Sequence, residues 1–191
     1  MFYFMKDYET FFKENYQHEE KKVNGILANL FGLLIFVIAS LIFGFFYYRV
    51  WGHFLTKPIY IVEAILFIVA MAASFFVHEM LHGMAWSKYT EVGINVILKS
   101  LFRLCYCREI IKARHYIFGL VIPTIILGII PILIGLCLGN FGIFVFGILG
   151  IAQGGDDFLS IYMLRSIGKD GFIKDTVSSF GFIIYTPSKI N

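Results

Sequence analysis

Four long apolar stretches divide the chain, and polar residues gather between them. The stretches cover residues 26–48, 59–86, 116–138 and 141–164. A helix that crosses a bilayer core of about 30 Å needs roughly 20 apolar residues, so each stretch is long enough to span a membrane. Pro123 and Pro131 fall inside the third stretch and predict a disturbed helix, which neighbouring helices can tolerate in a membrane. The pattern predicts an all-α membrane protein with four transmembrane helices.

The polar segments predict smaller elements outside these helices. Residues 1–23 mix charges with aromatic side chains, which fits an amphipathic helix on the membrane surface and equally well a solvated tail. Two β-prone runs, 92–98 and 180–185, predict a small cytoplasmic or re-entrant β element. We therefore expect an N-terminal amphipathic segment (1–23), one four-helix membrane core (24–165) and a C-terminal tail (166–191), with both end segments cytoplasmic.

Composition supports lipid as the solvent of this chain. Of its 191 residues, 59% are hydrophobic and 15% charged, with a mean hydropathy of +0.78, whereas ordinary globular domains have about 45–50% apolar and about 25% charged residues. A domain of this size cannot hide that excess in its core. This excludes a soluble globular enzyme. The net charge of +3 is spread over several loops, so no basic face indicates a nucleic-acid partner.

The distribution of basic residues predicts the orientation of the four helices. Of the sixteen Lys and Arg residues, fourteen lie in the N-terminal segment, in the loop 87–115 and after the fourth apolar stretch, from Arg165 onward. The remaining two lie in the loop 49–58, and the turn 139–140 has none. Because cytoplasmic loops carry the excess of Lys and Arg, the sequence predicts a multi-pass protein of the cell membrane with both termini in the cytoplasm.

The second apolar stretch carries a cluster of ionisable residues near its end. The sequence His78-Glu79-Met-Leu-His82 puts two imidazoles four positions apart, on one face of a helix, where both can bind a single ion. Glu79 is placed to act as the general base of a zinc hydrolase. Ionisable groups inside a membrane span are costly and indicate function. The sequence therefore predicts a Zn²⁺ site with His78 and His82 as ligands and Glu79 as the catalytic residue.

A catalytic zinc site needs a third protein ligand, and the fourth apolar stretch supplies two candidates. The histidines lie ten and six residues before Lys88, and Asp156 and Asp157 lie nine and eight residues before Arg165. At 1.5 Å per residue, all four side chains should lie roughly 9–15 Å inside the cytoplasmic boundary. One aspartate should bind the metal ion, and helical periodicity alone does not choose between them.

These residues resemble two groups of known proteins. The motif on one membrane helix, with an Asp on a later one, resembles the site-2 protease class of intramembrane metalloproteases. More closely, the chain is similar to a bacterial membrane family described as putative zincin peptidases. That similarity rests on the motif, Cys105-Tyr-Cys-Arg-Glu, Tyr116, Pro123, the Gly155-Asp156 pair and a tail like 175–185. It implies zinc, peptidase-like chemistry and an aspartate ligand, and should cover most of residues 60–187. The apolar residue that the family places after its Gly-Asp fits Asp157-Phe158, so both aspartates remain candidates.

The sequence thus predicts a zinc-dependent peptidase that hydrolyses peptide bonds near the cytoplasmic leaflet. Its partners would be membrane lipids and a peptide or transmembrane-protein substrate. The alternative is a non-catalytic metal-binding membrane protein that serves as a scaffold or in transport, because a structural or transported ion would use the same ligands. Cys105 and Cys107 could bind a soft metal, but two thiols make a poor site, and inert reduced cysteines are the more favoured interpretation.

Overall fold

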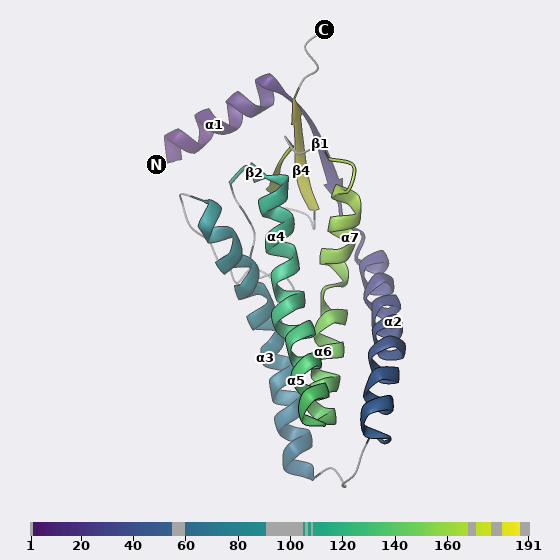
Figure 1. The fold of residues 1–191 in the computed structure, drawn as a ribbon. Helices are drawn as coiled ribbons and strands as arrows, with labels where there is room; N and C mark the ends of the chain where they lie inside the picture. The colour runs from purple at the N-terminus through teal and green to yellow at the C-terminus, as the bar shows by residue number, and fades with distance from the viewer. Residues whose placement is uncertain are drawn as a thin grey trace.

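Long helices run side by side, and a small sheet lies at one end of them (Figure 1). The computed structural model describes residues 2–54, 60–90, 105, 107, 109–167, 171–176 and 181–187. The main helices are α2 (Gly25–Trp51), α3 (Ile61–Trp86), α4 (Ala113–Pro123), α5 (Ile130–Leu138), α6 (Phe141–Gln153) and α7 (Gly155–Leu164). A single 3₁₀ turn, Ser87–Tyr89, follows α3. α3 packs against α4 and α6, while α2 packs against α6 and α7.

Among the residues that the structure describes, three helical segments are long and apolar enough to cross a membrane, and they coincide with the first three predicted stretches. They are Gly25–Trp51, Ile61–Tyr89 and Ala113–Leu138. A fourth span is possible if the bent pair α6 and α7 is taken as one. The protein is thus mostly helical with three to four candidate apolar spans.

The third segment contains the disturbance that its prolines predict. Between α4 and α5 the chain forms a π-helical turn, Thr124–Ile129, in which the Ile130 N–H bonds the carbonyl of Ile125. Pro131 has no N–H, so the carbonyl of Leu127 loses its usual partner four residues ahead. That carbonyl lies against Gly150 of α6, where an added Cβ would come within 2.7 Å of the carbonyl carbon. Only a glycine permits this approach.

The fourth segment bends where the sequence places two adjacent glycines. The axes of α6 and α7 differ by 44° across Gly154. Gly155 lies close to α2, since an added Cβ would lie 2.5 Å from the carbonyl oxygen of Ala28 and 2.9 Å from the Cα of Gly32. The break in the helix and the contact with α2 therefore fix where the following residues point.

The sheet joins both ends of the chain. Its strands are β1 (Tyr16–Lys22), β2 (Ile111–Lys112), β3 (Phe172–Asp175) and β4 (Gly181–Pro187), in the antiparallel order β1-β4-β3-β2. Strand β4 confirms the prediction for residues 180–185, whereas the run 92–98 lies outside the described residues. The N-terminal segment contains a helix, α1 (Phe2–Asn15), which is one of the two alternatives for this segment, whereas β1 was not predicted.

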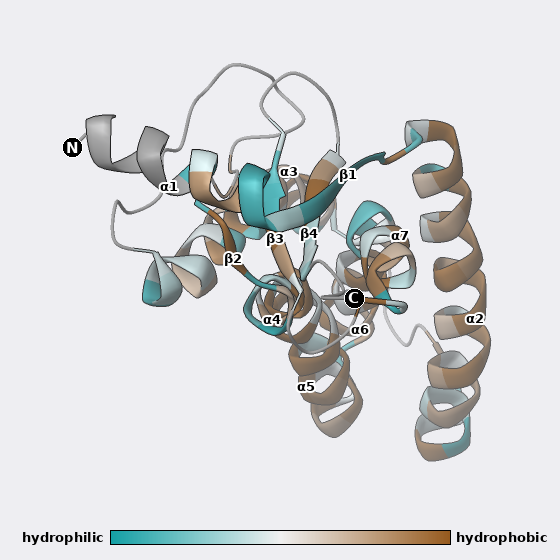
Figure 2. Ribbon diagram, turned by 90° about the horizontal axis from the view of Figure 1, so that it is seen from above, coloured by the Kyte–Doolittle hydropathy of each residue, from teal (hydrophilic) through white to brown (hydrophobic). Residues whose placement is uncertain are grey.

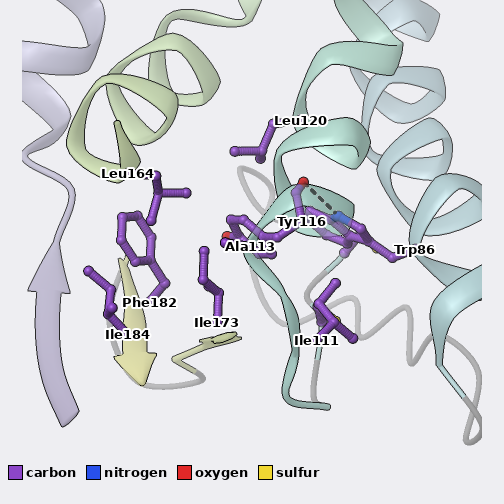
Figure 3. Packing of buried hydrophobic residues seen from close by; sticks show 11 residues of the cluster. Trp86, Ile111, Ala113, Tyr116, Leu120, Leu164, Ile173, Phe182 and Ile184 are labelled. Atoms are coloured by element: carbon purple, nitrogen blue, oxygen red, sulfur yellow. Dashed lines mark hydrogen bonds between the residues drawn. The ribbon is translucent and has the colours of Figure 1, made fainter. Parts of the chain in front are cut away.

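The two faces of the sheet pack against different partners, because side chains alternate along a strand. On one face, Phe12 of α1 is 3% exposed and contacts the rings of Phe172 and Tyr185. On the other face, Ile173 and Phe182 join the core that reaches the ends of α3, α4 and α7 (Figure 3). The second face therefore borders the part of the helical bundle that carries the polar motif.

Candidate active site

The motif on α3 brings three potential ligands together. His78 and His82 are 6% and 5% exposed, and the centroids of their rings are 4.8 Å apart. One ligand atom from each of His78, Glu79 and His82 can be chosen so that all three lie within 4.8 Å of one another. The helix is unbroken here, so the spacing of four residues places both imidazoles on one face, as the sequence predicts, with their rings nearly perpendicular.

A carboxylate from α7 reaches both imidazoles. Asp157 is 4% exposed, and its Oδ2 lies 3.0 Å from Nε2 of His78 while its Oδ1 lies 3.2 Å from Nε2 of His82. Ligands about 2.0–2.2 Å from a tetrahedral zinc ion are about 3.3–3.5 Å apart. The two contacts of Asp157 are thus slightly shorter than the ligand separations that a shared ion requires. Asp156 instead has an exposed side chain at the border of the adjoining pocket.

The two helices that carry these residues are held in register by a second polar contact. The amide nitrogen Nε2 of Gln153 donates to Oγ of Ser74 at 2.7 Å. Ser74 precedes His78 by four residues, and Gln153 precedes Asp157 by four, so the two pairs are successive rungs between α3 and the α6–α7 segment. Polar contacts of this kind fix the register of helices in apolar surroundings. The Ser74–Gln153 contact therefore helps to set the height of Asp157 beside the motif.

His82 has a defined orientation. Its Nδ1 lies 2.9 Å from the carbonyl oxygen of Gly119 on α4. Because a carbonyl oxygen only accepts, Nδ1 carries the proton and Nε2 presents a lone pair for a metal ion. Trp86 stacks on the imidazole with ring centroids 5.2 Å apart and donates from its indole nitrogen to the carbonyl oxygen of Tyr116 at 3.1 Å (Figure 3). Gly119 leaves the room that the indole occupies, since an added Cβ would lie 2.6 Å from Cε2 of Trp86.

Glu79 borders a small pocket between α3, α7 and the sheet. Its Oε2 accepts a hydrogen bond of 3.1 Å from the backbone N–H of Cys105. The pocket has a volume of about 40 Å³, and its walls include His82, Asp157 and Phe182. A water molecule needs about 10–15 Å³ of such volume. The pocket therefore has room for a few water molecules beside the motif, and a peptide can enter only if neighbouring segments move.

Two of the three cysteines, Cys105 and Cys107, are buried free thiols. Cys105 and Cys107 are both 3% exposed. Burial raises the pKa of the Cys107 thiol, and the nearby carboxylates of Asp175 and Glu109 raise it further. A protonated thiol is a poor ligand and nucleophile. This supports the interpretation of these residues as inert and reduced.

The donor set suits zinc, and some of its surroundings could not be read from the sequence. Two imidazole nitrogens and one carboxylate, all buried, match the ligand type and number of a catalytic zinc site. The five predicted residues lie in one region, with Asp157 in contact with both histidines. The carbonyl of Gly119 and the N–H of Cys105 were not predicted, because backbone groups leave no residue-specific signal. Only Gly119 itself, a glycine inside an apolar run, indicates that another side chain can approach the backbone closely there.

Comparison with known proteins gives a family. A family model described as "Putative zincin peptidase" matches residues 71–171, which include the motif, α4 to α7 and both aspartates. Neither the search of curated proteins nor that of solved structures finds a significant match. The family match is shorter than the expected range 60–187, and it ends before β3. It covers slightly more than half of the chain, and this chain therefore belongs to the putative zincin peptidase family.

Proposed function

We propose that this protein is a zinc-dependent, membrane-embedded peptidase that cleaves peptide bonds near the cytoplasmic leaflet, as the resemblance to site-2 proteases implies. The observation that carries the proposal is the contact of Asp157 with both imidazoles of the motif, at 3.0 and 3.2 Å. Two separate apolar helices would thereby supply three buried ligands beside the carboxylate of Glu79. Family membership independently favours zinc peptidase chemistry.

Apolar exposure supports the membrane part of the proposal. Only 17% of the most apolar window of α2 and 11% of that of α3 is buried within the protein. Figure 2 shows hydrophobic residues along most of α2 and α5. So much exposed apolar surface is unusual for a soluble monomer, and lipid would cover it. The sequence predicts four transmembrane helices, and the distribution of Lys and Arg predicts that both termini are cytoplasmic. This topology would put the sheet on the cytoplasmic side.

In this proposal the protein side chains bind the metal ion, hold its ligands in place and transfer protons. His78, His82 and one carboxylate oxygen of Asp157 would hold the zinc ion. Zinc, when bound, supplies Lewis-acid polarisation of the substrate carbonyl. Glu79 would accept a proton from the attacking water and return it to the leaving amine, the usual work of a general acid–base residue. The hydrogen bond from His82 to Gly119 holds the imidazole in the tautomer that can bind metal.

The site position suggests the substrate class. The motif would lie roughly 9–15 Å inside the cytoplasmic boundary, within reach of the ends of transmembrane helices and of peptides at the membrane surface. The walls of the pocket include Gly181 and Phe182, the first residues of β4. We therefore propose a peptide or a transmembrane protein as the substrate, reaching the pocket from the side of the sheet.

One set of variants tests this function. The protein would be purified in detergent micelles, with zinc measured by mass spectrometry and hydrolysis measured on a library of quenched fluorescent peptides. Wild type should bind one zinc ion and cleave some of the peptides. His78→Ala should lose the zinc, while Glu79→Gln should keep it and lose cleavage. Glu63→Gln is the matched control, since this residue caps the start of the same helix about 24 Å away. Stoichiometric zinc without hydrolysis in wild type would instead support a non-catalytic metal-binding protein.

A further inference from the structure

A buried carboxylate ties three segments together beside the pocket. Asp175, the last residue of β3, is 1% exposed. Its Oδ2 accepts a hydrogen bond of 2.8 Å from the backbone N–H of Cys107, and its Oδ1 accepts a short one from the hydroxyl of Tyr116. In return, the backbone N–H of Asp175 donates to the carbonyl of Cys107 at 3.1 Å. The carboxylate thus joins the sheet, helix α4 and the segment that contains the two cysteines.

The same segment contacts Glu79. Two residues before Cys107, the backbone N–H of Cys105 donates to Oε2 of Glu79. Both cysteines are 3% exposed, and both Cys105 and Tyr116 border the pocket. A glutamate side chain has several rotamers and loses considerable freedom when it is held in one. A fixed donor at Oε2 therefore limits the directions in which the carboxylate can point.

We propose that Asp175, together with Tyr116, is a positioning residue for Glu79. It acts through the backbone: its carboxylate fixes Cys107, and this places the N–H of Cys105 where it orients the carboxylate of the general base. The inference rests on the proposed role of Glu79 and deepens it. Asp175 lies beyond residues 71–171, the part of the chain that the family model matches.

We call Asp175, Tyr116 and the backbone of Cys107 together the brace. The packing around the brace explains why it can be stiff. The hydroxyl of Tyr116 reaches Asp175 from α4, while its ring stacks on Trp86 of α3 with ring centroids 5.1 Å apart. Trp86 in turn stacks on His82. Figure 3 shows Tyr116 lying between Trp86 and the buried side chains of β3 and β4. The brace therefore spans from the sheet to the helix that carries the motif.

Variants of the brace test the proposal. Asp175→Asn keeps the side-chain shape but removes one acceptor oxygen, and Tyr116→Phe removes only the hydroxyl. Misplacing a catalytic group by about 1 Å can cost about 100-fold in rate. For Asp175→Asn we expect a fall of roughly 10–100-fold in kcat, with KM unchanged and zinc retained, and for Tyr116→Phe a smaller fall in kcat. The control is Ile173→Val, a fully buried neighbour on β3 that should leave kcat within about twofold of wild type.

Hydrogen exchange supplies a readout that is independent of turnover. In Asp175→Asn the amide of Cys107 should exchange faster, followed by that of Cys105, while the amides of α3 keep their wild-type protection. The kinetic arm uses a quenched fluorescent peptide that wild type cleaves and Glu79→Gln does not. If wild type cleaves no peptide, the proposed function fails, while the exchange arm still tests the brace. An Asp175→Asn protein with unchanged kcat, or with unchanged exchange at Cys105, would overturn the inference. So would a general loss of protection and zinc, which indicates a merely structural role.

Discussion

The contact between α3 and α4 at Gly119 offers a direct test of how the site is held. In Gly119→Ala the new Cβ would lie 2.6 Å from Cε2 of Trp86 and closer still to its indole nitrogen. Ordinary contacts of this kind begin near 3.4 Å and the nearest indole atom would lie only 1.9 Å from the new Cβ, so the indole and α4 must separate by about 1.5 Å. The hydrogen bond from His82 to the carbonyl of Gly119 is now 2.9 Å. A comparable displacement would stretch it beyond about 3.6 Å, where it no longer counts as a hydrogen bond.

Loss of this bond has a measurable size. Removing an outer partner of a metal-binding histidine typically lowers metal affinity about 10–100-fold, which is about 1.4–2.8 kcal/mol. Overpacking should also lower the free energy of unfolding by about 1–3 kcal/mol. We therefore expect Gly119→Ala to fold, to melt at a lower temperature and to bind zinc at least tenfold more weakly than wild type.

The assay is a zinc titration against a chromophoric chelator of known affinity, in the same detergent for all variants. Gly44→Ala is the matched control, since an added Cβ there has nothing within 4 Å, and its zinc affinity should equal that of wild type. Thermal unfolding of the zinc-free proteins shows that both variants are folded. A folded Gly119→Ala protein whose zinc dissociation constant stays within threefold of wild type would refute the role given to the Gly119 carbonyl.

Three other perturbations test separate features. Asp157→Ala should weaken zinc binding by more than about 100-fold, above the range for outer partners, while Asp156→Ala should stay near wild type in the same titration. Gly155→Ala puts a methyl group 2.5 Å from a carbonyl oxygen of α2. Thermal unfolding should therefore show that the free energy of unfolding falls by about 1–3 kcal/mol. At Glu9, burial raises the pKa, but hydrogen bonds and charge from two lysines, Lys174 first, outweigh it and hold the pKa below 4.5. A depressed carboxyl pKa stabilises the fold above the unfolded value, and this is lost as the pH falls through the folded value. The protection factors of the α1 amides should therefore fall below pH 4.5, and Lys174→Met should weaken that pH dependence while Lys13 still pairs with Glu9.

The helices and the motif could be predicted because their signals are local. A span needs only length and apolar composition, and α2 and α3 begin and end within three residues of the predicted stretches. The pairing of His78 with His82 needs only the helical repeat. The sequence also placed the two aspartates in the same region, because their depth follows from counting residues to the next basic side chain.

The choice between the aspartates could not be predicted, because it depends on the rotation of α7. Successive residues on a helix point about 100° apart, so a small change in rotation exchanges Asp156 and Asp157. That rotation is set by the 44° bend and by the contact of Gly155 with α2. Both are tertiary features, which the local sequence pattern does not determine.

Strand β1 illustrates a different limit. Its sequence, Tyr16–Lys22, consists mainly of charged and polar residues, most of them exposed, and lacks the alternation that predicts a strand. It is held by backbone pairing with β4, from Tyr16 opposite Pro187 to Lys22 opposite Gly181. Charged residues suit the edge of a sheet, because they discourage further pairing. The signal for this strand thus lies in a partner more than 150 residues away.

Close helix packing explains why a backbone carbonyl lies beside the motif. In apolar surroundings helices approach closely through small residues, and close approach brings main-chain carbonyl and N–H groups within reach of side chains. Gly119 on α4 supplies such an acceptor to His82 on α3. A scan of variants should therefore show larger losses of zinc affinity at buried glycines such as Gly119 than at large exposed side chains such as Phe76. If Phe76→Ala weakened zinc binding as much as Gly119→Ala, the site would depend on general packing of α3 rather than on these backbone contacts.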